Sequence, residues 1–289
     1  MVGRRTHAVS RMLRRCLGLL ALVPATMGSR LEGQRVVVTG GGRGIGRAIS
    51  LLCASEGARV AILSRSATEL EEVASAAMDR GAVHEVVYKV ADVTNDEQVD
   101  VAIKDVSEIF GGIDILINNA GMGCSKGPMH EQSSDAFRSL LDLNVVAVAS
   151  VTNAVLRHAM LSQGKGDIIN ISSKAGKVGL PNMGPYVASK FALEGLTATF
   201  AAELASTGIR VNSISPGMVD TKAFPKAPGR PGVRTAESVA DGLLHVLGSG
   251  RTGVYLHVDE FDAAVAAGTP DSALKAIDEP AFVPQQCES

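Results

Sequence analysis

The sequence predicts an α/β protein with an open parallel sheet. Two observations support this prediction: short runs rich in β-branched residues alternate with helix-like stretches, and a glycine-rich turn follows the first run. The chain has 289 residues and 46% hydrophobic content, enough for one large core. Neither an internal repeat nor a linker-like boundary stands out before residue 222, so we expect one catalytic domain. The expected strands lie at residues 35–39, 59–63, 85–90, 113–118, 167–172, 210–215 and 253–258.

The turn after the first strand has the composition of a phosphate-binding loop. Its glycines are Gly40, Gly41, Gly42, Gly44 and Gly46. They give the spacing G-x-x-x-G-x-G rather than the commoner G-x-G-x-x-G. A helix follows, because Ile45, Ile49 and Leu52 share one helical face. Such a turn brings the backbone close to a pyrophosphate and points the positive end of the helix at it, although tight packing alone also favours glycine.

A second pattern lies in the stretch YVASK. Tyr186 and Lys190 are four residues apart, and Ser173 precedes the tyrosine by thirteen residues. Positions i and i+4 share a helix face, so a phenol and an ammonium would lie side by side. A neighbouring cation lowers the pKa of a phenol from its usual value near ~10. These groups suit proton transfer at a carbonyl oxygen whose carbon exchanges a hydride, but a Tyr–Lys pair alone is more often a bland exposed pair.

Together, six motifs in order resemble the short-chain dehydrogenase/reductase family, from about residue 33 to about residue 260. The motifs are TGGGRGIG at 39–46, Asp92-Val93, NNAG at 118–121, Asn144 within LNV, Ser173 with Tyr186 and Lys190, and Pro216-Gly217 with Val219 and Thr221. The resemblance implies a single doubly wound Rossmann domain, residues 33–262, with a mostly parallel seven-stranded sheet.

The resemblance also implies catalytic roles for four residues. Asn144 would position a water that relays protons, and Ser173 would hold the substrate carbonyl oxygen. Tyr186 would be the general acid in reduction, and Lys190 would lower its pKa and bind the nicotinamide ribose. Ser172 competes with Ser173 on sequence alone, and the thirteen-residue offset to the tyrosine selects Ser173.

A larger set of residues is implied to contact the cofactor. The set is Thr39, Gly40, Arg43, Gly44, Ile45, Gly46, Ser64, Arg65, Asp92, Val93, Asn119, Ala120, Gly121, Tyr186, Lys190, Pro216, Gly217, Val219 and Thr221.

The end of the second strand indicates NADP(H) as the cofactor. Relatives that use NAD usually carry an acid where Ser64 stands, and a carboxylate there would repel a 2′-phosphate. Arg65 follows it, and Arg43 approaches from the glycine loop. Two guanidiniums suit one phosphate dianion, although both could instead be solvated surface arginines.

The start of the chain differs in charge from the rest. Residues 1–30 hold six arginines and no acid, and removing those six charges from the overall −2 leaves −8 for the remainder. The acidic body argues against nucleic acid or an anionic membrane as its partner. The arginine-rich start predicts an organelle transit peptide, mitochondrial or plastid. An apolar stretch at 16–23 leaves a secretory or membrane-anchoring start open, with membrane association only if the leader is retained; a mis-assigned start or a disordered tail is the remaining alternative.

No metal site or disulfide framework is expected. The four cysteines lie far apart, and the six histidines lack ligand spacing. Cys124, just past NNAG, either faces the active-site mouth or is an inert loop thiol. Residues 263–289 contain three prolines and are expected to form a loose tail.

The substrate is less defined by the sequence. Residues 222–234, which form a lid in the family, are short, basic and proline-containing, and they predict an open pocket for varied carbonyls. Their basic residues, Lys222, Lys226, Arg230 and Arg234, either meet an anionic substrate or are solvated.

The C-terminal motif HVDEF at 257–261 departs from the V-D-G-G of acyl-carrier-protein reductases. Glu260 and Phe261 replace small residues that pack across a tetramer interface, so a homodimer or a homotetramer stays open. We therefore expect an NADPH-dependent carbonyl or aldehyde reductase acting on a small molecule. An organellar 3-oxoacyl-carrier reductase, a hydroxysteroid-type dehydrogenase and, more remotely, a redox-silent NADP(H)-binding sensor or scaffold are the alternatives.

Overall fold

The structure, a computed structural model, describes residues 29–221, 226 and 230–278. All but the last two residues of the expected leader lie outside these ranges, as do Lys222 and residues 279–289 of the expected tail. The strands are β1 (Arg35–Thr39), β2 (Arg59–Ser64), β3 (Val87–Val90), β4 (Ile115–Asn118), β5 (Gly166–Ile171), β6 (Ile209–Ser215), β7 (Met218–Val219), β8 (Val233–Arg234), β9 (Val254–His257) and β10 (Leu274–Ala276). The helices are α2 (Gly44–Ser55), α3 (Ala67–Asp79), α4 (Asp96–Phe110), α5 (Ser134–Leu141), α6 (Ala147–Val155), α7 (Leu161–Gln163), α8 (Gly184–Glu203), α9 (Ala240–Gly248) and α10 (Val258–Ala266).

The predicted α/β architecture with a mostly parallel sheet is confirmed. Within the described residues, the main sheet has the order β10-β9-β6-β5-β4-β1-β2-β3. Within this sheet, β1 to β6 and β9 pair in parallel with their neighbours, and β10 pairs antiparallel with β9 at one edge. The order reverses between β1 and β4, and in open α/β sheets this reversal is where ligands bind.

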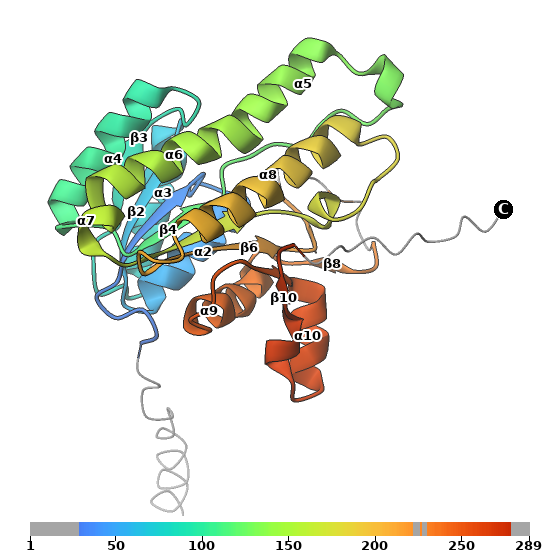
Figure 1. Cartoon of the computed structure of the whole chain (residues 1–289). Helices are drawn as coiled ribbons and strands as arrows, with labels where there is room; N and C mark the ends of the chain where they lie inside the picture. Colours follow the sequence, from blue (N-terminus) through green and yellow to red (C-terminus); the bar gives the residue numbers. More distant parts are fainter. Residues whose placement is uncertain (1–28, 222–225, 227–229, 279–289) are drawn as a thin grey trace, which may run out of the picture.

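Helices cover both faces of this sheet (Figure 1). On one face α2, α3 and α9 bury aliphatic side chains such as Ile49, Leu70 and Leu243. On the other, α4, α6 and α8 bury Ile103, Val151 and Ala201. The central strands are buried on both faces, which explains why they read as continuous apolar runs rather than as alternating ones.

Local signals fix the ends of the helices. The Asn95 side chain accepts a hydrogen bond from the Gln98 N–H at 3.0 Å and begins α4, and Gly111 ends it in the left-handed conformation. Helices α5 and α6 join through a π-helical turn, η2 (Asp142–Val146), into one long run. That run, Ser134–Gln163, is long and apolar enough to cross a bilayer, but half of its most apolar window is buried inside the fold, as in a core helix.

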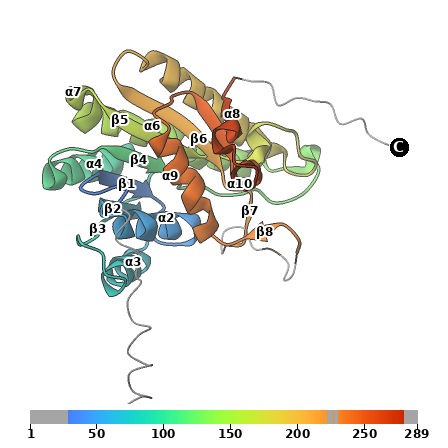
Figure 2. The same cartoon turned by 90° about the horizontal axis from the view of Figure 1, so that it is seen from below.

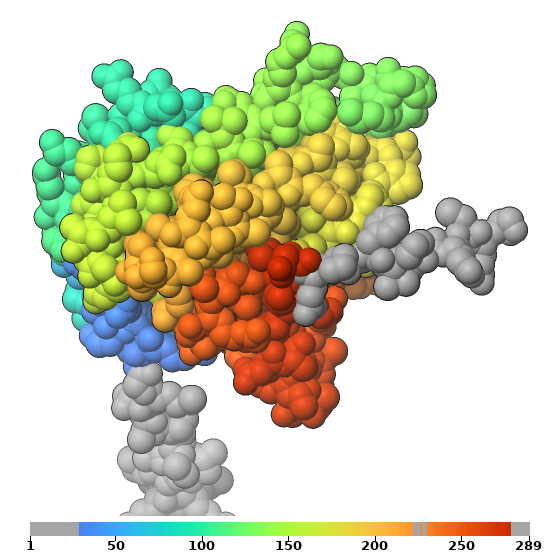
Figure 3. Space-filling view, viewed as in Figure 1, coloured from blue at the N-terminus to red at the C-terminus, as the bar shows by residue number. Residues whose placement is uncertain are grey.

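The expectation of a loose tail from residue 263 is wrong for the described part of that segment. Helix α10 extends to Ala266, and β10 pairs with β9 from Leu274↔Leu256 to Ala276↔Val254. Leu274 and Ile277 are buried, and Figure 3 shows this end of the described chain, in dark red, packed against the body. The pairing covers the edge of β9, which would otherwise present unpaired backbone groups.

The HVDEF motif also departs from a simple strand end. His257 ends β9 and caps α10, so the acidic residues that follow it lie in the first helical turn. Phe261 is 6% exposed and its ring lies 4.9 Å from that of His245 on α9. The residue that replaces a small one in the motif therefore packs inside this chain.

We expect Leu274→Ala to lower the free energy of unfolding by about 2–4 kcal/mol, because it deletes a buried side chain between β9 and α9. Leu161→Ala, the same change at a side chain that is 52% exposed, serves as the matched control and should stay within about 0.5 kcal/mol of wild type. Urea denaturation of both variants measures the difference. Equal stabilities would restore the view that this segment is a loose tail.

Candidate active site

The predicted site residues gather at the carboxyl ends of the parallel strands. The glycine loop follows β1, Ser64 ends β2, Asp92 follows β3, NNAG ends β4, Ser173 follows β5 and Pro216 follows β6. Because parallel strands end at the same edge, six sequence segments separated by up to 177 positions meet there.

Thr39 and Asn119 fasten the glycine loop to the end of β4. The Thr39 hydroxyl accepts hydrogen bonds from the backbone N–H groups of Asn119 (3.0 Å) and Ala120 (3.1 Å). In return the Asn119 amide donates to the carbonyl oxygens of Thr39 (3.0 Å) and Gly40 (3.2 Å). These two predicted contact residues therefore set the shape of the loop.

The loop leaves no room for a side chain where it turns into α2. A Cβ on Gly46 would lie 2.2 Å from the Gly40 carbonyl oxygen and 2.4 Å from the Asn119 amide nitrogen. Helix α2 begins at Gly44 without a side-chain cap and without an acidic residue in its first turn. A bare helix N-terminus behind a close-packed glycine loop fits the pyrophosphate of a dinucleotide.

The corner at the end of β2 contains the residues expected to recognise the 2′ position. Each arginine there is paired with a carboxylate: Arg43 with Glu69 at 3.4 Å, and Arg65 with Asp92 at 3.7 Å. Both arginine side chains are at least half exposed, so these are weak surface pairs. Asp92 also accepts hydrogen bonds from Thr94, which lower its pKa. The following residue, Val93, is buried, as is Ala91 before it.

Ser173 and Tyr186 meet at the mouth of the site. Ser173 leads into the short 3-10 turn η4 (Lys174–Gly176), and Tyr186 lies in the first turn of α8. Their side chains are hydrogen-bonded, while burial raises the pKa of Tyr186 and the bond to Ser173 opposes that rise. Ser172, the competing serine, points away into the interior and is 3% exposed.

Lys190 lies one turn further along α8 and is buried beneath the tyrosine. Its Nζ is 5.8 Å from the Tyr186 ring centroid and donates to the Ile171 carbonyl oxygen at 2.9 Å. Burial lowers the pKa of Lys190 to about 8, against the opposing effect of Glu194. The expected lowering of the tyrosine pKa by Lys190 is not seen, because the ammonium faces the ring and a carbonyl oxygen while burial dominates at the phenol.

Asn144 lies in the π-helical turn η2, which directs its side chain inward. Its Oδ1 accepts from the Met122 N–H at 2.9 Å, and its Nδ2 donates to the Met122 carbonyl (2.9 Å) and to Ser189 Oγ (3.1 Å). Asn144 therefore links the segment after NNAG to the residue next to Lys190. The extra residue of a π-helical turn is a common feature of functional sites.

The segment after β6, which is expected to lie beside the nicotinamide, borders the site. Pro216 and Val219 are buried, and Gly217 lies between them. The Thr221 side chain lies 3.3 Å from the position a Cβ on Gly44 would take, so this segment touches the glycine loop. Figure 2 shows the β7–β8 pair beside α10 and apart from the main sheet.

Arg234 anchors this segment rather than meeting a substrate. Its guanidinium pairs with Asp259, at 3.3 Å, and with Asp262, both on α10. Of the other basic residues expected in the lid, Lys222 lies outside the described residues. Lys226 is described between two undescribed stretches, and Arg230 begins the described range that follows.

The wall beside Tyr186 is apolar. Leu140 and Ala175 are buried with the tyrosine, and partly buried residues pack against them: Met122, Cys124, Leu180, Met183 and Val187. Cys124 packs against the cluster that contains Tyr186, so it lies near the site mouth rather than in a remote loop.

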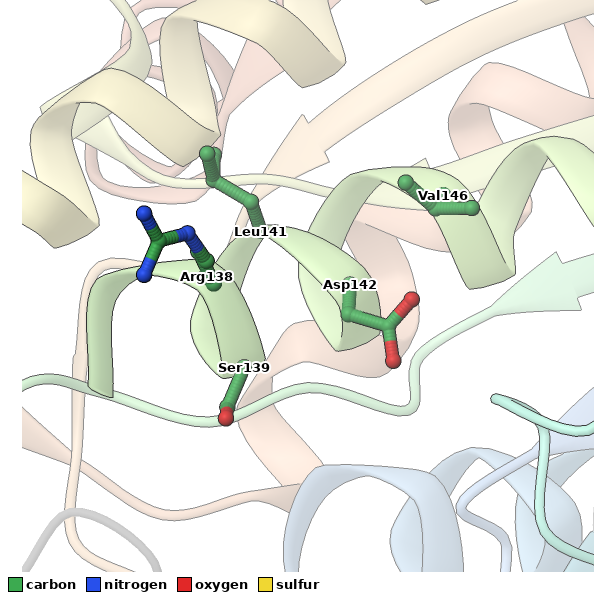
Figure 4. Close-up of a pocket in the computed structure, with 5 residues that line it drawn as sticks. All are labelled: Arg138, Ser139, Leu141, Asp142 and Val146. Atoms are coloured by element: carbon green, nitrogen blue, oxygen red, sulfur yellow. The ribbon is translucent and has the colours of Figure 1, made fainter. Parts of the chain in front are cut away.

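A shallow surface pocket lies on the outer face of the same helical run. Arg138, Leu141, Asp142 and Val146 line it, together with Ser139 (Figure 4). Asn144 belongs to this run but is 1% exposed, whereas Val146 is 55% exposed. The pocket and the catalytic residues therefore occupy opposite sides of the helix.

Sequence reasoning missed several members of the site. Glu69 was recognisable from the capping box S-x-x-E, because the Ser66 hydroxyl accepts from the Glu69 N–H at 3.3 Å and fixes the start of α3. The apolar wall had no such signal, since its members come from three segments that only the fold brings together. No group of three or more His, Cys, Asp or Glu residues with metal-site geometry occurs within the described ranges.

Comparison with known proteins gives a consistent result. The sequence pattern described as "short chain dehydrogenase" matches residues 34–229. L-fucose dehydrogenase from Bos taurus is 37% identical over 195 residues, which cover 68% of this chain and 69% of that protein. Cis-4-hydroxycyclohexanecarboxylate dehydrogenase from Sinomonas cyclohexanicum is 36% identical over 195 residues, covering 68% and 77%.

Solved structures share this architecture over most of the chain. A short-chain dehydrogenase from Burkholderia cenocepacia in complex with NADP is 34% identical, with a TM-score of 0.71, and the match covers 79% of this chain and 97% of that one. An NAD⁺-bound xylitol dehydrogenase is 33% identical, with a TM-score of 0.72 and coverage of 78% and 98%. With its glycine loop, its Ser–Tyr–Lys arrangement and these relatives, the chain belongs to the short-chain dehydrogenase family.

Proposed function

We propose that this protein is an NADP(H)-dependent oxidoreductase that reduces an aldehyde or ketone to an alcohol. The observation that carries the proposal is the contact between the Ser173 and Tyr186 hydroxyls, with Lys190 buried behind the tyrosine ring. Two hydroxyls that lie within hydrogen-bonding reach of each other are suited to bind one substrate oxygen together. The glycine loop and the bare N-terminus of α2 lie at the same edge of the sheet.

The side chains have distinct parts in this reaction. The bound nicotinamide supplies the hydride. Ser173 donates a hydrogen bond to the carbonyl oxygen and holds it against Tyr186, which delivers the proton as the oxygen gains charge. Lys190 keeps a positive charge beneath the ring, and Asn144 fixes the helix segment that carries Lys190 through Ser189. In alcohol oxidation the same groups act in reverse.

The choice of NADP(H) rests on the end of β2. Ser64 stands where a carboxylate would exclude a 2′-phosphate, and Arg43 and Arg65 flank it. Both arginines are held by single carboxylates in exposed pairs, which contribute about 0–1 kcal/mol each. A phosphate dianion offers a stronger partner to both, because charge-assisted bonds to phosphate are among the strongest polar contacts. One of the similar structures holds NADP and another NAD⁺, so the choice between the two cofactors rests on the residues at the end of β2.

The apolar wall favours a carbonyl on an apolar body. Met122, Leu180 and Met183 offer contact area but no hydrogen bonds for the hydroxyls of a sugar. A pocket lined in this way rejects polyols, since their hydroxyls would lose water without gaining partners. Of the two sequence relatives, cis-4-hydroxycyclohexanecarboxylate dehydrogenase is therefore a better guide to the substrate than L-fucose dehydrogenase.

A 3-oxoacyl-carrier reductase is the second candidate, and one observation favours it. Burial lowers the pKa of Lys226, and the nearby charges of Arg230 and Lys126 lower it further, while Asp220 opposes them. Three cations near the segment that follows Cys124 suit an acidic carrier protein.

We expect Tyr186→Phe to reduce kcat by roughly 10²–10⁴-fold, because it removes the proton donor. The affinity for NADPH should stay close to wild type, since the change leaves the glycine loop untouched. Steady-state kinetics and NADPH fluorescence titration measure the two quantities on one preparation. A variant with wild-type kcat would remove Tyr186 from the mechanism.

We expect Arg65→Ala to weaken NADPH binding roughly 10-fold and to leave NADH nearly unchanged, because only NADPH carries the 2′-phosphate. Ser64→Asp should weaken NADPH further by adding repulsion, and Arg80→Ala, an exposed arginine at the far end of α3, is the matched control. The kcat/KM values for both nucleotides decide the matter. Preference of the wild type for NADH would show that the cofactor proposal is wrong.

With NADPH we expect cyclic and acyclic ketones and aldehydes to be reduced at least 10-fold more efficiently than aldoses, because the wall beside Tyr186 lacks hydrogen-bond partners. A substrate panel with product identification measures this, and an acetoacetyl-carrier protein belongs in it. Preference for the carrier would favour the second candidate, and failure with every carbonyl and alcohol would favour a redox-silent NADP(H)-binding protein.

A further inference from the structure

A buried ion pair joins helix α8 to the segment after η4, and it has no part in the chemistry described above. Glu194 follows Lys190 by one turn of α8, and its carboxylate is 3.5 Å from the Lys177 ammonium. The two side chains are 7% and 11% exposed. Ser213 on β6 donates a further hydrogen bond to Glu194 Oε2 at 3.0 Å. A carboxylate so enclosed is costly to keep unless its charge serves a purpose or is well compensated.

Lys177 connects this pair to the rest of the site. It directly follows η4, the turn that begins at Ser173, and its ammonium lies 4.8 Å from the centroid of the Tyr255 ring on β9. It also donates to the carbonyl oxygen of Ile277, just beyond β10. The pair thus joins the serine turn, α8, β6, β9 and the C-terminal segment.

The serine turn and α8 touch at the same place. A Cβ on Gly176 would lie 2.8 Å from the Lys190 carbonyl oxygen and 2.9 Å from Glu194 Cγ, so only glycine permits this approach. The contact brings the backbone of Lys190, the stem of Glu194 and the turn that carries Ser173 together.

We propose that Glu194 is a buried counter-charge to Lys190, held in place by Lys177, and so is a positioning residue for the reaction proposed above. The inference rests on that proposed function. Glu194 touches neither the substrate site nor the cofactor loop, so it acts through Lys190.

The charges around the pair agree with this role. Burial lowers the pKa of Lys190 to about 8, and Glu194 raises it against that effect. Burial raises the pKa of Glu194, while Ser172, Lys177 and Ser213 oppose the rise. Tyr255, the titratable group that faces the pair from β9, stays neutral because burial raises its pKa. From α8 itself, Lys190 lies one turn before Glu194.

The charge of Glu194 acts on the protonation of Lys190. An anion one turn away favours the protonated form of Lys190, so its removal lets the ammonium lose its proton at a lower pH. A neutral Lys190 supports neither the charge developing at Tyr186 nor the ribose of the cofactor. Loss of the Glu194 charge therefore lowers the upper limit of the pH range in which the enzyme is active.

We expect Glu194→Gln to move the alkaline fall of kcat/KM for NADPH to lower pH by roughly one unit. The alkaline weakening of NADPH binding, which needs no turnover, should move with it. Glu203→Gln, the same change at an exposed position on the same helix, should match wild type in both profiles. Profiles of Glu194→Gln that overlay those of wild type and Glu203→Gln would overturn the proposal.

A second variant covers the case in which Glu194→Gln does not fold. Glu194→Gln combined with Lys177→Met removes both charges of the pair, so Lys177 is not left as an unpaired cation in the interior. Because the loss of the Lys177 cation partly offsets the loss of the Glu194 anion, the alkaline shift should keep its direction and be smaller than in Glu194→Gln. No shift toward lower pH in this double variant would overturn the proposal.

Failure of the proposed function has a different signature. In that case the wild type itself would turn over no carbonyl or alcohol. The binding profile would still report on Glu194 and Lys190.

Discussion

The hydrogen bonds between Thr39 and Asn119 are the contact on which the rest of the site depends. They join the ends of β1 and β4, where the strand order reverses and the sheet opens. Because the Asn119 amide also holds the Gly40 carbonyl, the glycine loop is fixed before any cofactor arrives. The remaining site residues are placed relative to this junction by the register of β4 with β5 and of β5 with β6. A site assembled at strand ends can thus be rigid although its residues come from loops.

A ladder of buried amides and hydroxyls extends this order to the catalytic helix. Asn118 donates to Thr152 on α6 and to Asn170 on β5, and Asn170 donates to Thr197 on α8 at 2.8 Å. Each of these groups would be costly to bury alone, and the ladder satisfies their amide donors, whereas Asn118 Oδ1 has no hydrogen-bond partner among the described residues. The ladder fixes α8 against the sheet, so Tyr186 and Lys190 keep their distance from the end of β5, which Ser173 follows.

The C-terminal segment takes part in the same design. By pairing with β9, β10 covers one edge of the sheet, and the residue after it accepts a hydrogen bond from Lys177. The C-terminal part of the described chain is in this way linked to the turn that Ser173 caps. Phe261, which stands where acyl-carrier-protein reductases have a small residue, is buried against α9 of the same chain.

The sequence by itself determined the features that rest on local spacing. These features are the alternation of strands and helices, the glycine loop, and the i, i+4 pairing of Tyr186 with Lys190, and each depends on residues close together in the chain. Only the tertiary structure decided the pairing of Lys177 with Glu194, the carboxylates that hold Arg43 and Arg65, and the place of β10. It also reversed the expected direction of the Tyr186 pKa, because burial depends on packing from distant segments. Local patterns fix backbone conformation, whereas burial and charge pairing depend on which distant segments the sheet order brings together.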